Sequence, residues 1–249
     1  KPAMLLATEY LCDLRVDPLQ HPRGQPHLSA ASGLVRLGAW LYVVADDEHH
    51  LGVFEDALTT ESAAGSHGAT GSLLRLFDGD LAQEPRKRKK AKPDLESLAL
   101  LPPLPGCPHG ALLALGSGSR PSRETGVLMA LDASGAVRGR MAQVDLSALY
   151  APLRTRFADL NLEGAFVASG ELHLLQRGNK GDARNACIRF DWNHVAPWLA
   201  GQRPQAPLAK AVQSIDLGEV NGVPLSLTDG APLSAGAWVF TAVAENTGD

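Results

Sequence analysis

The chain has 249 residues, of which 45% are hydrophobic, a formal net charge of −4 and an isoelectric point near 6.1. This composition supports a sizeable core and excludes wholesale disorder, and the mild acidity argues against nucleic acid as the main partner. No apolar run approaches the roughly 20 residues that span a bilayer, so we expect no membrane partner.

Short apolar segments separated by polar turns begin near the N-terminus. Residues 3–11 and 14–16 are apolar, and residues 20–27 form a polar loop with two prolines. A first repeat then follows, with strands predicted over residues 34–37, 40–45, 51–54 and 73–77. Residues 59–71 are small and polar, and predict a loop within this repeat. Brief strands of this kind, bounded by Gly and polar residues, are typical of an all-β protein.

The later repeats have the same form. A dense basic run over residues 86–92 precedes the second repeat, and we expect it to be a solvated loop. The predicted strands of the second and third repeats cover residues 98–101, 111–115, 126–131, 137–144, 164–168, 171–176, 186–190 and 214–217. Residues 146–157 predict a short helix or a loop, and residues 192–201 have helical spacing. The fourth repeat ends in a strand over residues 238–244.

The starts of the four repeats recur at a nearly fixed interval. Ser32, Glu96, Glu163 and Asp229 are 64, 67 and 66 residues apart. A four-stranded unit at fixed spacing predicts a β-propeller with four-stranded blades. We expect a single domain over residues 1–249, with repeats over about 32–80, 94–145, 161–218 and 228–249. Because the fourth repeat is short, the N-terminal strands are expected to help close the ring; five or six blades stay open if the chain is truncated.

Equivalent residues of different blades should meet near the propeller axis, because the innermost strands line the central channel. This geometry predicts a ring that contains Glu96, Glu163 and Asp229. The residues that end the second strands, which are Asp46, Ser117, Arg177 and Glu245, should form an adjacent rim. The alternative interpretation is that the acidic residues and their glycines are turn residues, which Asp and Gly favour for local reasons.

Several of these segments carry a family resemblance. The stretches Pro93-Asp94-Leu95-Glu96-Ser97, Asn161-Leu162-Glu163-Gly164, Leu174-Leu175-Gln176-Arg177-Gly178-Asn179, Thr228-Asp229-Gly230-Ala231 and Ala244-Glu245-Asn246-Thr247 resemble the strand motifs of the phytase-like esterase propellers and of a related group of bacterial propeller proteins. The resemblance covers roughly residues 30–249. It implies a propeller with polar, often calcium-associated sites at the channel mouth, and weakly implies activity on phosphate or carboxylic esters. Ser32 and Ser97 depart from the motif.

Two functions are therefore predicted. In the first, Asp46, Glu96, Glu163, Asp229 and Glu245 bind calcium through their oxygens, with Glu96, Glu163 and Arg177 as catalytic residues of an ester or phosphate-ester hydrolase. Arg177 would bind the phosphate or carboxylate of a small anionic substrate. In the second, the propeller is a non-catalytic ligand-binding or scaffold protein whose acids and Arg177 pair with one another.

The cysteines bear on the compartment. Cys12, Cys107 and Cys187 are odd in number and widely spaced, which does not indicate a disulfide framework. A cytoplasmic location is favoured on this ground, and a periplasmic one stays open if a leader was removed. The sequence does not indicate an oligomeric state.

Overall fold

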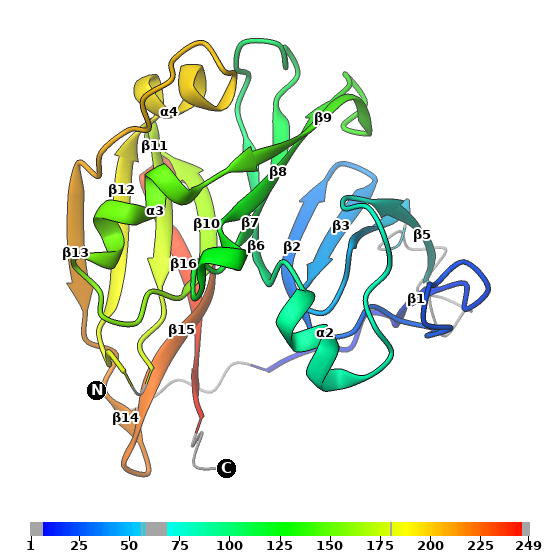
Figure 1. Cartoon of the computed structure of the whole chain (residues 1–249), viewed down its shortest axis with the longest axis horizontal. Helices are drawn as coiled ribbons and strands as arrows, with labels where there is room; N and C mark the ends of the chain where they lie inside the picture. The colour runs from blue at the N-terminus through cyan, green and yellow to red at the C-terminus, as the bar shows by residue number, and fades with distance from the viewer. Residues whose placement is uncertain (1–6, 56, 58–68, 180, 246–249) are drawn as a thin grey trace.

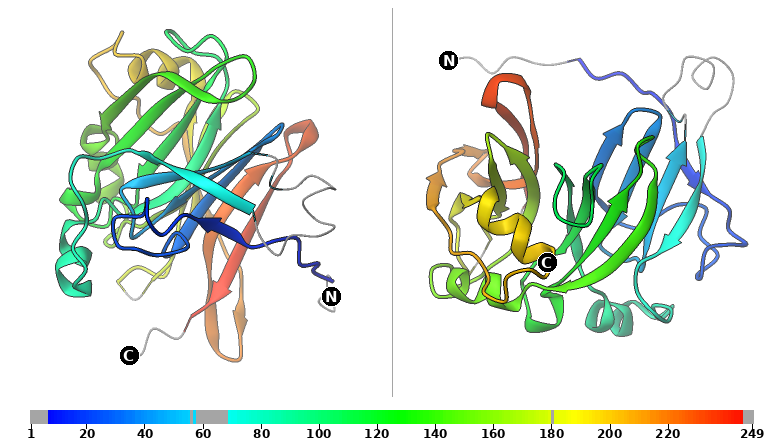
Figure 2. Two further views of the ribbon diagram at one scale, coloured as in Figure 1. Left: turned by 90° about the vertical axis from the view of Figure 1, so that its right-hand side faces the viewer. Right: turned by 90° about the horizontal axis from the view of Figure 1, so that it is seen from above.

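The computed structural model describes residues 7–55, 57, 69–179 and 181–245, which form four β-sheets arranged as a four-bladed β-propeller (Figure 1). The predicted fold class is therefore confirmed. The innermost strands of the four blades are β2 (Ala31–Leu37), β6 (Leu95–Leu101), β10 (Leu162–Ala168) and β15 (Val223–Pro232). They pack against one another around the axis, with β2 beside β6, β6 beside β10, and β10 beside β15, while β15 also approaches β2. Figure 2 shows the sheets side by side around this axis.

The first three blades each contain four antiparallel strands, which follow one another from the axis outward. Blade one comprises β2 (Ala31–Leu37), β3 (Trp40–Ala45), β4 (His50–Glu55) and β5 (Ala69–Arg75). Blade two comprises β6 (Leu95–Leu101), β7 (Ala111–Gly116), β8 (Thr125–Leu131) and β9 (Val137–Asp145). Blade three comprises β10 (Leu162–Ala168), β11 (Glu171–Gln176), β12 (Asn185–Asp191) and β13 (Ala211–Ile215).

The fourth sheet is smaller and corrects one prediction. It comprises β14 (Glu219–Val220), β15 (Val223–Pro232) and β16 (Trp238–Ala244). The N-terminal strand β1 (Leu14–Val16) does not join this sheet, because it pairs in parallel with β5 at the outer edge of blade one. The expectation that N-terminal strands close the ring is therefore wrong for β1. The described residues contain four blades, rather than the five or six that the sequence left open.

In the part of the chain that the structure describes, three short α-helices lie in the connections between the blades or between their strands. They are α2 (Pro85–Ala91), α3 (Ser147–Arg154) and α4 (Trp192–Leu199). The side chain of Asp191 caps α4 by accepting a hydrogen bond from the Asn193 amide at 2.9 Å. The predicted loop over residues 86–92 is thus mostly helical. Of the predicted loop over residues 59–71, residues 59–68 lie outside the described residues, and the remainder belongs to β5. Within the described residues, no helix is long and apolar enough to cross a membrane.

The core lies between the blades. Every residue of β7 and of β11 is buried, because a strand in the middle of a blade is covered on both faces by neighbouring blades. One apolar cluster joins blades one and two, and a larger one joins blades two and three with residues of α3 and α4. The apolar residues that dominate these buried strands explain why the repeats can be recognised in the sequence.

Glycines allow the innermost strands to approach closely near the axis. A Cβ atom added to Gly33 would lie 2.7 Å from the backbone nitrogen of Leu98 in the next blade. A Cβ added to Gly164 would lie 3.1 Å from the nitrogen of Gly230. The glycines at these repeat starts therefore lie in strands where neighbouring blades approach closely, and not in turns.

Candidate functional site at the mouth of the propeller

Each innermost strand carries a β-bulge, which lies close to the start of β2, β6 and β10 and in the middle of β15. The pairing register shifts between Ala31 and Gly33, between Leu95 and Ser97, between Leu162 and Gly164, and between Leu227 and Asp229. The additional residues at these shifts are Ser32, Glu96, Glu163 and Thr228. A bulge adds one residue to a strand and redirects its side chain. Two members of the predicted ring, Glu96 and Glu163, thus occupy equivalent positions together with Ser32, whereas the equivalent residue of the fourth blade is Thr228 and not Asp229.

The predicted rim is formed by the residues that directly follow the second strands. Asp46, Ser117, Arg177 and Glu245 come immediately after β3, β7, β11 and β16. The first three are fixed by equivalent backbone hydrogen bonds of 2.8–2.9 Å, in which their amides donate to the carbonyls of Ala30, Asp94 and Asn161. The fold therefore places these residues at the same height on their blades.

The ring residues and three of the rim residues, with Ser117 excepted, line an open pocket of about 560 Å³. All five acidic residues that were predicted to bind a metal line this pocket, as does Arg177. The complete lining comprises Ala30, Ala31, Ser32, Asp46, Glu96, Glu163, Arg177, Thr228, Asp229, Thr241 and Glu245. The sequence thus identified the acidic residues of one pocket although they are distributed over four blades. We call it the axial pocket.

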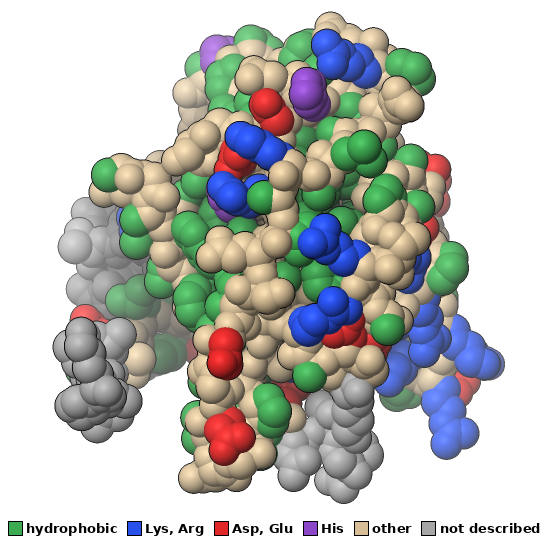
Figure 3. All heavy atoms as spheres, turned by 90° about the vertical axis from the view of Figure 1, so that its left-hand side faces the viewer, with side chains coloured by type: hydrophobic (Ala, Val, Ile, Leu, Met, Phe, Trp, Pro, Cys, Tyr) green, Lys and Arg blue, Asp and Glu red, His purple; other side chains and the backbone are tan. Residues whose placement is uncertain are grey.

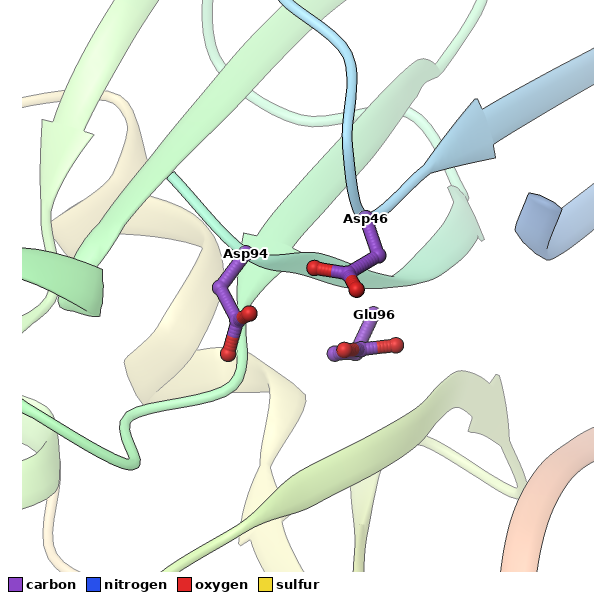
Figure 4. A group of neighbouring side chains, drawn as sticks. All are labelled: Asp46, Asp94 and Glu96. Carbon is purple, nitrogen blue, oxygen red and sulfur yellow. The ribbon is translucent and has the colours of Figure 1, made fainter. Parts of the chain in front are cut away.

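One wall of the axial pocket adjoins a close group of three carboxylates, contributed by Asp46, Asp94 and Glu96 (Figure 4). One ligand atom from each of these side chains lies within 4.8 Å of the others. Asp94 was not predicted as a site residue. The signal in the sequence was its position two residues before Glu96, and the structure shows that the chain enters the innermost strand there with a backbone φ of 58°. Glu163, Asp229 and Glu245 line the pocket but do not belong to this close group.

Two basic side chains offset part of the negative charge of these three carboxylates. The Lys92 ammonium contacts the Asp46 carboxylate, and it lies 3.1 Å from Asp94 Oδ1 and 3.4 Å from Asp47 Oδ1. Arg123 Nη1 lies 2.8 Å from Asp94 Oδ2, which also accepts a 2.5 Å hydrogen bond from the Ser117 hydroxyl. Lys92 ends the basic run that we expected to be solvated, yet it is buried. Neither basic partner was recognised from the sequence.

These contacts shift the pKa values of Asp94 and Asp46 in opposite directions. Burial alone would raise the pKa of Asp94, but its hydrogen bonds with Asp46 and Ser117 and the Arg123 charge bring that pKa below its usual value. Burial and the hydrogen bond with Asp94 raise the pKa of Asp46 to about 6, against the opposing effect of Lys92. At neutral pH, Asp94 is therefore ionised, whereas Asp46 binds a proton more tightly than an ordinary aspartate does.

Glu96 is the least compensated carboxyl group of the site. Burial raises its pKa to about 9, assisted by the charges of Glu163, Asp46 and Asp94 and opposed by Lys92. Among the described residues, no donor forms a hydrogen bond or an ion pair with the Glu96 carboxylate. Glu96 is thus protonated at pH 7 unless another positive charge enters the pocket.

On the opposite side of the pocket, Arg177 forms ion pairs with two of the acidic residues. Burial raises the pKa of Glu163. Arg177, at 3.4 Å, and a 2.7 Å hydrogen bond from the side-chain amide of Asn161 oppose this effect. Arg177 also contacts Glu245, with its Nη2 atom 2.5 Å from Glu245 Oε2. Burial raises the pKa of Asp229 to about 6, with a smaller contribution from the Glu163 charge.

The fold and the site define the protein as a four-bladed β-propeller with an acidic pocket at one end of its axis. A model described as a family of unknown function, DUF6929, matches residues 27–249, and the chain belongs to this family. No curated protein matches the chain. The resemblance to phytase-like esterases stays a prediction, because the family match provides no link to them.

Proposed function

We propose that the axial pocket binds a hard divalent cation, with calcium as the best-fitting ion. The observation that carries this proposal is the Glu96 carboxyl group, which is partly buried beside two other carboxylates and has no donor among the described residues. Calcium binds six to eight oxygen ligands at flexible geometry, and it accepts carboxylates together with waters. An open pocket lined by carboxylates and threonine hydroxyls fits these requirements.

The position of Lys92 determines which groups are free to bind the ion. Lys92 lies against Asp46 and Asp94, so its ammonium already occupies one side of the close group. The Glu96 side faces the pocket, where Glu163 and Asp229 also lie. We therefore expect the ion to lie on the Glu96 side, with Lys92 retained as a partner of Asp46 and Asp94.

Proton release provides a direct test. Since the pKa of Glu96 is about 9, a cation that binds at pH 7 should displace close to one proton from this group. Calorimetric titration with calcium in two buffers of different ionisation enthalpy measures this proton. We expect Glu96→Gln to abolish binding, and Glu55→Gln, a matched charge change at an exposed strand end, to leave it unchanged. Absence of calcium binding to the wild type, or equal binding by Glu96→Gln, would contradict the proposal.

We also propose that a cation bound in the axial pocket supports the hydrolysis of esters. A bound metal ion would polarise an ester or phosphoryl oxygen and lower the pKa of a bound water. The protein would contribute Glu96 and Glu163 to position the ion and to accept protons, and Arg177 to orient an anionic group. A panel of carboxylic esters and phosphate esters, assayed with calcium and with a chelator, tests this step. Turnover that survives the chelator, or that survives Glu163→Gln, would oppose it.

One observation favours the non-catalytic alternative. The Arg177 guanidinium is already paired with Glu163 and Glu245, so it satisfies polar groups at the rim as a structural residue would. A protein that binds calcium but turns over no member of the ester panel would be a binding or scaffold propeller. The calcium titration and the ester panel therefore separate the two functions.

A further inference from the structure

A second cavity lies beside the axial pocket, between blades three and four. It has a volume of about 520 Å³, which is in the range of sites for small organic ligands. Its walls are the segment that follows β11, with Arg177 and Asn179, and the hairpin between β14 and β15, with Asn221 and Val223. Arg177 and Glu245 line both cavities, so their ion pair forms the boundary between them.

The two residues of this ion pair differ strongly in exposure. The Arg177 side chain is 16% exposed, whereas the Glu245 side chain is 53% exposed. An ion pair with so accessible a carboxylate contributes little stability, because water solvates the free carboxylate well. The mostly buried guanidinium, in contrast, needs an anionic partner. The carboxylate of Glu245 is therefore the more replaceable member of the pair.

The residues that line this cavity indicate which ligand could replace the Glu245 carboxylate. Arginine binds carboxylates and phosphates through its planar set of donors. Val223, Pro224 and Ala183 provide apolar contacts, and Asn179 and Asn221 provide amides at the walls. Figure 3 shows that acidic, basic and apolar side chains are interspersed over the side of the molecule that carries β13 and β14. The attraction for an anion would therefore come from Arg177 itself, and not from a broad basic surface.

We propose that this cavity binds a small anion with an apolar body, whose carboxylate or phosphate replaces Glu245 on Arg177. In this arrangement Glu245 occupies the position of the ligand's anionic group when no ligand is bound. The site needs no metal, so it does not rest on cation binding in the axial pocket. Glu245 then acts as an internal competitor, and its removal should strengthen binding.

Calorimetry with benzoate and with phenyl phosphate, in the presence of a chelator, tests the proposal and separates the two anionic groups. We expect Glu245→Ala to bind the preferred probe several-fold more tightly than the wild type. Arg177→Gln should weaken binding by about tenfold or more, since a charge-assisted hydrogen bond is lost. Val223→Trp, which fills the cavity without changing Arg177, should also prevent binding while calcium titration of the axial pocket stays unchanged.

Three outcomes would overturn the proposal. One is that neither the wild type nor Glu245→Ala binds either probe. Another is that Glu245→Ala binds more weakly than the wild type, which would make Glu245 part of the site instead of a competitor. The third is binding that survives both Arg177→Gln and Val223→Trp. Circular dichroism of each variant establishes that the propeller is folded, and Arg177→Lys provides a second variant that keeps the charge beside Glu163.

Discussion

The protonation of Glu96 makes a quantitative prediction about stability and pH in the absence of metal. The pKa of Glu96 is about 9 in the folded protein, against an ordinary value of 4.5. Between these values the folded state binds the proton and the unfolded state does not. The free energy of unfolding should therefore fall as the pH rises through this window. Glu96→Gln retains the shape of the protonated side chain but cannot ionise, so it removes this contribution.

The magnitude follows from the width of the window. Each pH unit inside it corresponds to about 1.4 kcal/mol per proton, which gives about 4 kcal/mol between pH 5 and pH 8. Solvent that enters the axial pocket screens the Glu96 charge, so we expect a measured effect of about 2 kcal/mol. Glu96→Gln should match the wild type near pH 5 and should be more stable by this amount at pH 8.

Urea unfolding with a chelator, followed by circular dichroism at pH 5, 6, 7 and 8, measures the difference between the two proteins. Asp46 and Asp229, whose pKa values are raised to about 6, add a slope of the same sign to both proteins, so the difference isolates Glu96. Glu55→Gln is the control and should follow the wild type at every pH. A stability difference that does not change with pH would refute the assignment of a protonated Glu96.

Two further predictions concern the contacts that hold the site. Lys92→Met should lower the free energy of unfolding by about 3 kcal/mol at pH 8, because Asp46 and Asp94 lose a buried cation. This loss should shrink at pH 5, below the pKa of about 6 of Asp46; urea unfolding at both pH values measures it, and equal losses would contradict the role of Lys92. Gly164→Ala should destabilise the protein by about 1–3 kcal/mol, because the added Cβ would lie 2.9 Å from the Leu175 side chain and 3.1 Å from the Gly230 nitrogen. An unchanged thermal midpoint would show that the two blades can separate at little cost.

The architecture could be predicted from the sequence because each blade repeats the same local pattern. The second strands are mostly apolar, and a polar residue follows each of them, so Asp46, Ser117, Arg177 and Glu245 could be aligned. The predicted register failed by one residue in the fourth blade. Asp229-Gly230 imitates Glu163-Gly164 in sequence, but the bulge falls on Thr228. An acidic residue followed by glycine does not reveal which of two neighbouring residues is the extra one.

The remaining errors concern long-range partners. A run of basic residues is normally solvated, and the sequence does not show that Lys92, just beyond the end of α2, is buried between Asp46 and Asp94. The sequence also does not show which sheet edge β1 joins. A segment of three residues pairs with whichever strand its connection reaches, and in this protein that strand is β5 in blade one. Both depend on the arrangement of the whole ring, which local patterns do not encode.

The four bulges have a consequence for how this pocket can change. Each one lies on a separate sheet, and each exposes a single side chain to the axial pocket while the paired residues around it maintain the blade. A substitution at one bulge therefore changes one corner of the pocket while the strand pairing of the other blades is kept. Two hydroxyl residues and two acidic residues occupy these corners, as Ser32, Thr228, Glu96 and Glu163. The ligand preference of such a pocket can thus change through exchange of these four residues while the fold is retained.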